Sequence, residues 1–91
     1  MQNYKDLIVW QKSHQLTLAI FSITKNFPKE EQFVITSQLE IACLSVVLNL
    51  VEGCRKYTDA DTTNFFWISL GSAHETEYCI LLCKELNYIN Q

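Results

Sequence analysis

The residues with the clearest chemical potential are four cysteines, at positions 43, 54, 79 and 83. Cys79 and Cys83 are four residues apart, so both thiols fall on one face of a helix, where they could form an edge of a zinc site. Zinc needs four ligands, and His74 or Cys43 would have to complete the set. Cysteine also behaves as a small buried hydrophobe, and no Cys-x-x-Cys pair occurs. The core interpretation is favoured, and we predict neither a metal nor a cofactor.

Nucleophilic and acid–base chemistry find equally little support. Cys54 precedes Arg55 and Lys56, and basic neighbours lower a thiol pKa, but no histidine stands in a triad context. A zinc-protease motif beginning at His74 would need a second histidine where Tyr78 stands. Glu75 and Glu77 would point about 200° apart on a helix, so they do not form a catalytic pair. We predict no catalytic residue and no enzyme.

Polar residues on an otherwise apolar segment suggest a structural role. Gln38, Asn49 and Glu52 share one narrow strip with Ser45. Buried amides and carboxylates must be paired, so we expect an inter-helix polar network that fixes register, with Glu75 as a partner.

Basic residues are a weaker signal, because ten acids outnumber seven bases and the formal net charge is −3. Lys5 and Lys12 lie in the first third of the chain, and Arg55 and Lys56 lie in a predicted loop. They are candidate nucleic-acid contacts, although a solvated face is the commoner outcome.

The elements that must position these residues are helices. Two glycines and one proline in 91 residues are too few for the turns of a many-stranded sheet. A hydrophobic content of 48% argues against disorder. The composition predicts a single all-α domain, residues 1–91. Apolar periodicity places its long helices at about residues 6–26, 37–52 and 61–86.

Local signals set the expected helix ends. Asp6 is the candidate first N-cap, and Pro28 stops that helix. Ser37 and Glu40 form a capping box, and Gly53 suits a C-cap. Thr58 is followed by acids that suit a third helix start. Mid-helix Gly71, at a cost of about 1 kcal/mol relative to alanine, predicts close helix packing.

The first predicted helix is apolar on two sides, whereas a helix of a lone globule usually needs one apolar face. One stripe holds Leu7, Trp10, Leu18 and Phe21, and His14 lies between Trp10 and Leu18 on it as a core or interface residue. The other stripe holds Val9, Leu16, Ile20, Ile23 and Phe27. The second helix is apolar nearly all round. We therefore expect partner chains to complete the core.

The N-terminal residues carry no signal-peptide pattern, and the apolar stretch from Ile41 to Val51 is too short to span a bilayer. We expect a cytoplasmic protein with reduced thiols and no membrane association.

Several strings of the chain together resemble a known family. The opening Asn-Tyr-Lys-Asp-Leu-Ile-Val-Trp-Gln-Lys (3–12), Phe-Pro-Lys-Glu-Glu (27–31), Thr-Ser-Gln-Leu (36–39), Asn-Leu-Val-Glu-Gly (49–53), Phe-Phe-Trp-Ile-Ser-Leu-Gly-Ser (65–72) with Glu75, and Leu-Asn-Tyr-Ile (86–89) carry the likeness. In this order they resemble the four-helix-bundle proteins of the 23S rRNA intervening-sequence type, relatives of the accessory variability proteins of retroelements.

The resemblance implies an antiparallel up-down helical bundle that assembles as a ring, typically a pentamer. Three long helices are present, and the family's fourth helix has no counterpart before Gln91. The chain also has Glu40 and Ile41 where the family commonly has a pair of arginines. We therefore expect a homo-oligomerising scaffold. An accessory protein that binds RNA or DNA is the alternative, and a cysteine-based metal or redox site is a third hypothesis.

Overall fold

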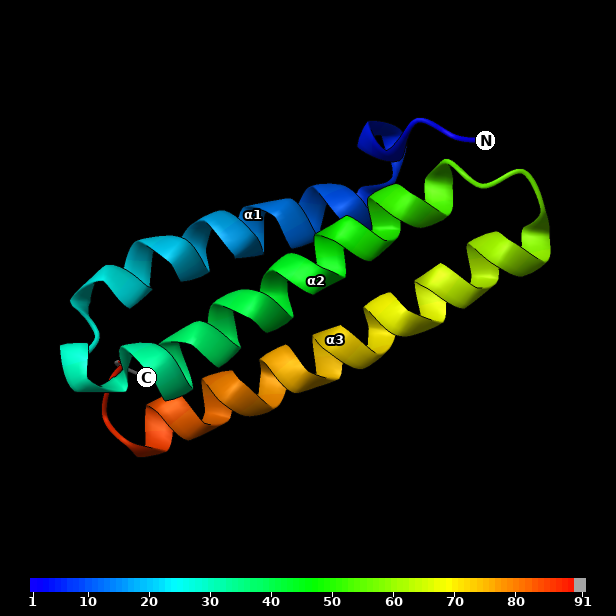
Figure 1. Cartoon of the computed structure of the whole chain (residues 1–91). Coiled ribbons are helices and arrows are strands. Elements are labelled where there is room, and N and C mark those ends of the chain that lie inside the picture. Colours follow the sequence, from blue (N-terminus) through cyan, green and yellow to red (C-terminus); the bar gives the residue numbers. More distant parts are fainter. Residues whose placement is uncertain (90–91) are drawn as a thin grey trace.

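Three long antiparallel helices make up most of the molecule. In the computed structural model, which describes residues 1–89, α1 spans Ile8–Ile23, α2 spans Ser37–Cys54 and α3 spans Asp59–Glu85 (Figure 1). No strand occurs within those described residues. The all-α, up-down prediction is confirmed, and each predicted helix is present with shifted ends.

The start of α1 differs from the prediction. Asp6 lies inside a short 3₁₀ turn, Tyr4–Asp6, which Asn3 caps by accepting a hydrogen bond from the Lys5 amide at 3.1 Å. Leu7 is then extended and precedes α1 without any side-chain cap. Asp6 as N-cap is therefore wrong, because the polar cap belongs to the turn before the helix.

The connection from α1 to α2 is a string of tight turns. A 3₁₀ turn, Thr24–Asn26, follows α1, and Pro28 precedes a second one, Lys29–Glu31. A π-helical turn, Gln32–Thr36, then runs directly into α2.

That continuity rules out the capping box predicted at Ser37. Thr36 is already helical, with φ −60° and ψ −50°, and the start of α2 has no side-chain cap. The Glu40 carboxylate instead accepts a hydrogen bond from the Thr24 hydroxyl at 2.8 Å. Glu40 thus ties α2 to the turn that follows α1.

Neither glycine has the role that the sequence suggested for it. Gly53 lies inside α2, which ends at Cys54 with Arg55 as C-cap, so the glycine C-cap is wrong. A Cβ at Gly53 would stand 2.8 Å from Phe66 Cε1 and 3.2 Å from Phe65 Cβ, so this glycine permits close packing of α3. A Cβ at Gly71 would have nothing within 4 Å, and close packing at Gly71 is wrong for the described chain.

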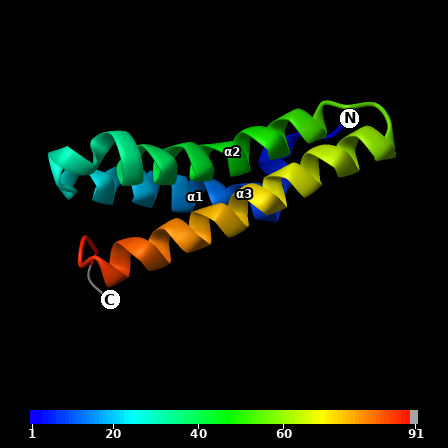
Figure 2. The same ribbon diagram turned by 60° about the horizontal axis from the view of Figure 1, so that its bottom comes forward.

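Both ends of α3 have identifiable stops. The Thr58 hydroxyl accepts a hydrogen bond from the Asp61 amide at 3.2 Å, which confirms the predicted cap. At the other end Asn87 has φ 63°, and the Tyr88 amide donates to the Cys83 carbonyl at 2.9 Å. This left-handed residue turns the chain back, and Tyr88 packs on Phe27 with ring centroids 5.8 Å apart. The end of α3 therefore lies beside the α1–α2 connection, as both views show (Figures 1 and 2).

The core is small and centred on α2, which packs along both other helices, whereas α1 and α3 make few direct contacts within residues 1–89. Its buried cluster consists of Ile20, Phe27, Leu39, Cys43 and Cys83. The molecule measures 43 × 20 × 19 Å, and its radius of gyration of 14.3 Å exceeds the roughly 12 Å expected for a compact chain of this length. A thin, elongated bundle of this kind leaves much apolar surface in water.

One helical run, Lys29–Cys54, is long and apolar enough to cross a membrane by length and composition alone. It extends beyond the eleven-residue stretch on which the sequence expectation rested. Core helices of globular bundles pass the same test, and α2 buries Leu39, Val47 and Leu50 against its neighbours.

Candidate interaction surface

The cysteines are packing residues. Cys43, Cys54 and Cys83 are buried, Cys79 is half-buried, and all four are free. Burial raises the pKa of each of these thiols, which works against a reactive thiolate at neutral pH. At Cys54 the positive N-terminus acts in the opposite direction but does not prevail. The core interpretation of Cys79 and Cys83 is confirmed, and among residues 1–89 no three His, Cys, Asp or Glu side chains are grouped as a metal site.

Of the residues predicted to form a polar network, Gln38, Asn49, Glu52 and Glu75, the structure of residues 1–89 links only Asn49 to α3. Asn49 bonds within its own helix, donating to the Ser45 carbonyl at 2.8 Å, and Glu52 pairs with Arg55 and Lys56 at 3.1 and 3.2 Å. Gln38 and Glu75 are exposed. Asn49 also donates to the Ser45 hydroxyl at 3.0 Å, and Ser45 in turn bonds Ser72 on α3, so this strip reaches the neighbouring helix through Ser45 and not through Glu75.

Small hydroxyl side chains make the contacts between α2 and α3 instead. Ser69 donates to the Val46 carbonyl at 2.8 Å, and Thr62 donates to the Gly53 carbonyl at 3.0 Å. The hydroxyls of Ser45 and Ser72 share a hydrogen bond of 2.7 Å. The signal was present in the sequence: Thr62, Ser69, Ser72 and Thr76 recur at steps of seven, three and four, the spacing of one helix face. Small residues at these positions let the two helices approach closely.

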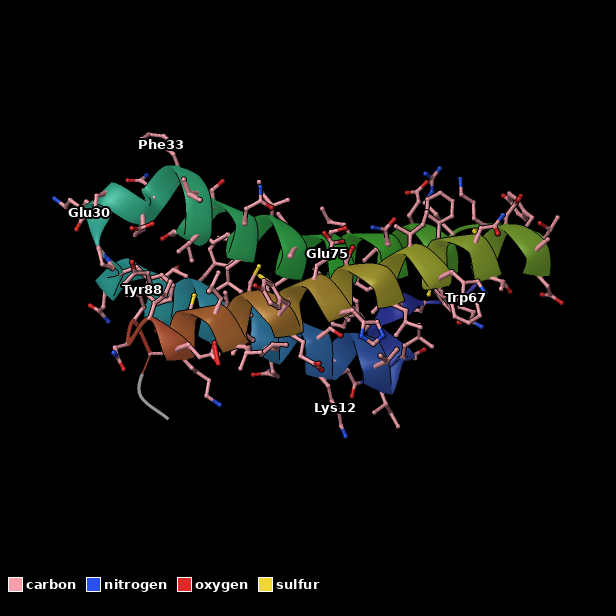
Figure 3. All side chains as sticks on the ribbon, turned by 90° about the horizontal axis from the view of Figure 1, so that it is seen from below. Lys12, Glu30, Phe33, Trp67, Glu75 and Tyr88 are labelled. Atoms are coloured by element: carbon pink, nitrogen blue, oxygen red, sulfur yellow. The ribbon has the colours of Figure 1, made fainter. Side chains whose placement is uncertain are left out.

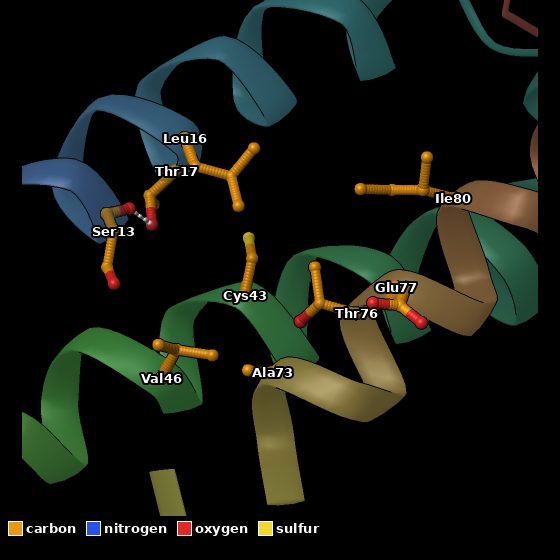
Figure 4. A pocket seen from close by; sticks show the side chains of 9 residues that line it. All are labelled: Ser13, Leu16, Thr17, Cys43, Val46, Ala73, Thr76, Glu77 and Ile80. Carbon is orange, nitrogen blue, oxygen red and sulfur yellow. Dashed lines mark hydrogen bonds between the residues drawn. The ribbon is translucent and has the colours of Figure 1, made fainter. Parts of the chain in front are cut away.

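An apolar groove separates α1 from α3, and α2 forms its floor (Figure 4). Its central part is a hollow of about 310 Å³, lined by Ser13, Leu16, Thr17, Cys43, Val46, Ala73, Thr76, Glu77 and Ile80. A second hollow of about 240 Å³ shares Leu16 and Ile80 with it and extends to Ile23, Lys84 and Ile89. We call these residues together the α1–α3 groove.

Hydroxyl groups in this groove do not make it polar. Thr17 donates to the Ser13 carbonyl and Thr76 donates to the Ser72 carbonyl, each at 2.8 Å. With their hydroxyls bonded to their own helices, these threonines have no need of a polar partner from outside. The charged residues lining the groove are one acid, Glu77, and one base, Lys84, so its net charge is close to zero.

The opposite side of α2 carries a second apolar surface, which we call the α2 ridge. It consists of Ile41, Leu44 and Leu48, which are 59%, 40% and 55% exposed. Ile41 is two residues before Cys43 in the groove floor, and Leu48 is two residues after Val46. A two-residue step turns an α-helix by about 200°, so the ridge faces away from the groove.

The whole chain except its first four residues matches one known protein family. The model of the family described as 23S rRNA-intervening sequence protein matches residues 5–91. The chain belongs to this family. No curated protein matched it.

The basic residues of this 23S rRNA-intervening sequence protein do not form one evident patch. Arg55 and Lys56 both pair with Glu52, and the hydrogen bond from Lys56, together with the two positive charges, lowers the pKa of that carboxyl. Lys12 extends away from the bundle (Figure 3). Lys5 is exposed in the N-terminal turn, close in sequence to Gln2, whose amide donates to the Cys54 carbonyl at 2.8 Å. The structure thus brings the start of the chain to the end of α2.

Tyr4, in the turn before α1, forms an aromatic cluster with Trp10 and His14 on α1. Trp10 stacks on His14 with ring centroids 4.9 Å apart and planes 8° from parallel, and Tyr4 meets the Trp10 ring edge-on at 4.9 Å. His14 is therefore a half-buried packing residue, in keeping with the core interpretation. In contrast, Phe33 in the π turn is 89% exposed and extends from the bundle (Figure 3).

Proposed function

We propose that this member of the 23S rRNA-intervening sequence protein family is a non-enzymatic scaffold that assembles with copies of itself. The observation that carries the proposal is the balance of apolar surface: among residues 1–89, exposed large apolar side chains outnumber the buried ones. Soluble monomers rarely expose large contiguous apolar patches, and such patches mark interaction sites. A chain of this length also buries too little of its surface for a generous core of its own.

A ring, typically a pentamer as the family resemblance implies, is the assembly we propose for the cytoplasm, with no cofactor and no membrane partner. Size-exclusion chromatography with light scattering tests it at micromolar protein concentration. The expected result is a single species several times the mass of one chain. A monodisperse monomer would overturn the proposal.

Nucleic-acid binding is the second candidate, supported by the contact between the N-terminal segment and the end of α2, where Lys5 and the Arg55–Lys56 pair reside. Lys12 would add a fourth charge from α1. Binding through these residues should weaken steeply as salt increases, because phosphate contacts release counterions. A fluorescence titration with structured RNA and with duplex DNA at low salt tests this role. Absence of binding by the wild-type chain would end it.

A further inference from the structure

We propose that the hollow at the α1–α2 connection binds a nucleoside monophosphate whose base is guanine. The hollow has a volume of about 380 Å³ and is formed by the end of α1, the turns that follow it and the start of α2. It lies at the end of the bundle opposite the N-terminus (Figure 1). The site is therefore separate from Lys5 and the Arg55–Lys56 pair, and the inference goes beyond the proposed self-assembly.

Two threonines and one glutamate give the hollow a polar wall. Thr24 is 6% exposed, and its hydroxyl donates to Oε2 of Glu40 at 2.8 Å. A carboxylate can accept about four hydrogen bonds, so Glu40 can accept further donors. Thr36 is 7% exposed, and its hydroxyl is buried without a hydrogen-bond partner among residues 1–89. Buried polar groups are nearly always bonded, so this hydroxyl is a group that a ligand atom can satisfy.

The remaining walls of the hollow are aromatic and basic. Phe21 lines it with 38% of its surface exposed, and the buried Phe27 lies behind the turn. Lys25 and Lys29 also line it and are exposed, and neither forms an ion pair within the described part of the chain. A ligand that suits these walls combines a flat ring for the phenylalanine with an anionic group for the lysines.

The positions of Lys29 and Glu40 set the length of this ligand. The two residues are eleven positions apart on one continuous helical run, or about 16 Å along its axis at 1.5 Å per residue. Helical side chains lean toward the N-terminus, so Lys29 leans away from Glu40. An α-amino acid has its ammonium and carboxylate on one carbon atom and is too short to meet both residues. A nucleoside monophosphate has its base edge and its phosphate at opposite ends, and the hollow has the size of a small-molecule site.

The Glu40 carboxylate determines which base fits. The Watson–Crick edge of guanine presents two adjacent N–H donors, and a carboxylate accepts such a pair. Adenine and cytosine place one amino group beside an acceptor nitrogen, which a carboxylate repels, and uracil has one N–H between two carbonyl acceptors. Guanine therefore meets Glu40 with its donor edge, packs its ring against Phe21 and leaves its phosphate for Lys29.

Isothermal titration calorimetry at low salt tests the class of ligand. The probes are guanosine monophosphate, adenosine monophosphate, tryptophan and inorganic phosphate. We expect guanosine monophosphate to bind at a single site and adenosine monophosphate to bind about tenfold more weakly, because the paired hydrogen bonds are lost. Phosphate and tryptophan should not bind measurably. The proposal is overturned if guanosine monophosphate does not bind, or if any other probe binds as tightly. A guanine tetranucleotide that binds more tightly than the mononucleotide would also overturn it, since a strand would then be the ligand.

Variants with matched controls test whether the binding occurs in this hollow. Glu40→Gln keeps an oxygen that can accept from Thr24 but replaces the carboxylate with an amide, so the preference for guanine over adenine should be lost. Glu30→Gln makes the same change at an exposed acid that does not line the hollow, and it should keep the preference.

A second pair of variants tests the stacking. Phe21→Ala should weaken binding about tenfold, because it removes the ring on which the base stacks. Phe33→Ala, at an 89% exposed site outside the hollow, should leave the affinity unchanged. Circular dichroism verifies that every variant keeps the wild-type helix content. If Glu40→Gln keeps the guanine preference, or if Phe21→Ala binds as tightly as Phe33→Ala, the assignment to this hollow is wrong. Neither result bears on self-assembly, which has its own test.

Discussion

Replacing Gly53 and Gly71 with alanine, one at a time, should have opposite effects on the stability of the protein. Both glycines lie inside helices without positive φ, so alanine gains about 1 kcal/mol of helix propensity at either one. At Gly71 nothing stands within 4 Å of the new methyl group. Gly71→Ala should therefore stabilise the protein by about 1 kcal/mol.

At Gly53 the methyl group meets α3. Its carbon would lie 2.8 Å from Phe66 Cε1, 2.9 Å from Phe66 Cδ1 and 3.2 Å from Phe65 Cβ. Distances this short force the Phe66 ring or the helices apart, and overpacking of this kind costs about 1–3 kcal/mol. After the propensity gain, Gly53→Ala should be destabilising by about 0–2 kcal/mol, so the two variants should differ by about 1–3 kcal/mol.

Thermal unfolding followed by circular dichroism measures this difference. Each kcal/mol corresponds to about 4–8 °C in a domain of this size, so Gly71→Ala should melt at least about 4 °C above Gly53→Ala. All samples need the same protein concentration, because assembly shifts the melting temperature. If Gly53→Ala melted at or above Gly71→Ala, the close packing of α2 on Phe66 would be refuted.

Three further changes have expected outcomes. Thr58→Ala removes the cap of α3 and should cost about 1 kcal/mol in urea unfolding, whereas Thr63→Ala, at an exposed site in the same helix, should cost less. The folded-state pKa of Glu52 is lowered, so its contribution to stability is present above its ordinary pKa near 4.5 and is lost as the pH falls through the lowered value. Glu52→Gln should therefore make stability depend less on pH in this acidic range. An unchanged pH dependence of stability there would contradict the pairing of Glu52 with Arg55 and Lys56. Thiol labelling at pH 8 should be slow in the native protein and fast in guanidinium chloride, since burial raises the thiol pKa values, and rapid native labelling of Cys43 or Cys83 would argue against the described core.

Long-range features of the fold were readable from the sequence because they rest on periodicity. Scarce glycine and proline with helical apolar spacing predicted all three helices. The two apolar stripes of α1 were real, but burial divides them differently: Ile20 and Phe27 enter the core, while Leu16 and Leu18 stay exposed. Periodicity identifies a face, and only the neighbouring helix determines whether that face is covered.

The wrong predictions at Ser37 and Gly53 have a common physical origin: each rested on a short sequence pattern that is compatible with more than one local structure. Ser37 and Glu40 have the spacing of a capping box, but the preceding π turn already supplies a helical continuation, so no cap is needed. A glycine after an apolar run suits both a C-cap and a close helix contact, and at Gly53 the ring of Phe66 on α3 decided between them. Phe66 is thirteen residues away along the chain, beyond the reach of any local pattern.

The central position of α2 also governs how the molecule opens. Because α1 reaches α3 mainly through α2, α1 can detach while the serine and threonine contacts between α2 and α3 stay formed. Native-state hydrogen exchange should then divide the chain into two units, with the α2–α3 hairpin opening at a higher free energy than α1. The hairpin consists of sequence neighbours joined by a short loop, and helix pairs of this kind fold quickly. The first helix is thus the part of the bundle that detaches most easily, and the α1–α3 groove changes shape whenever α1 detaches.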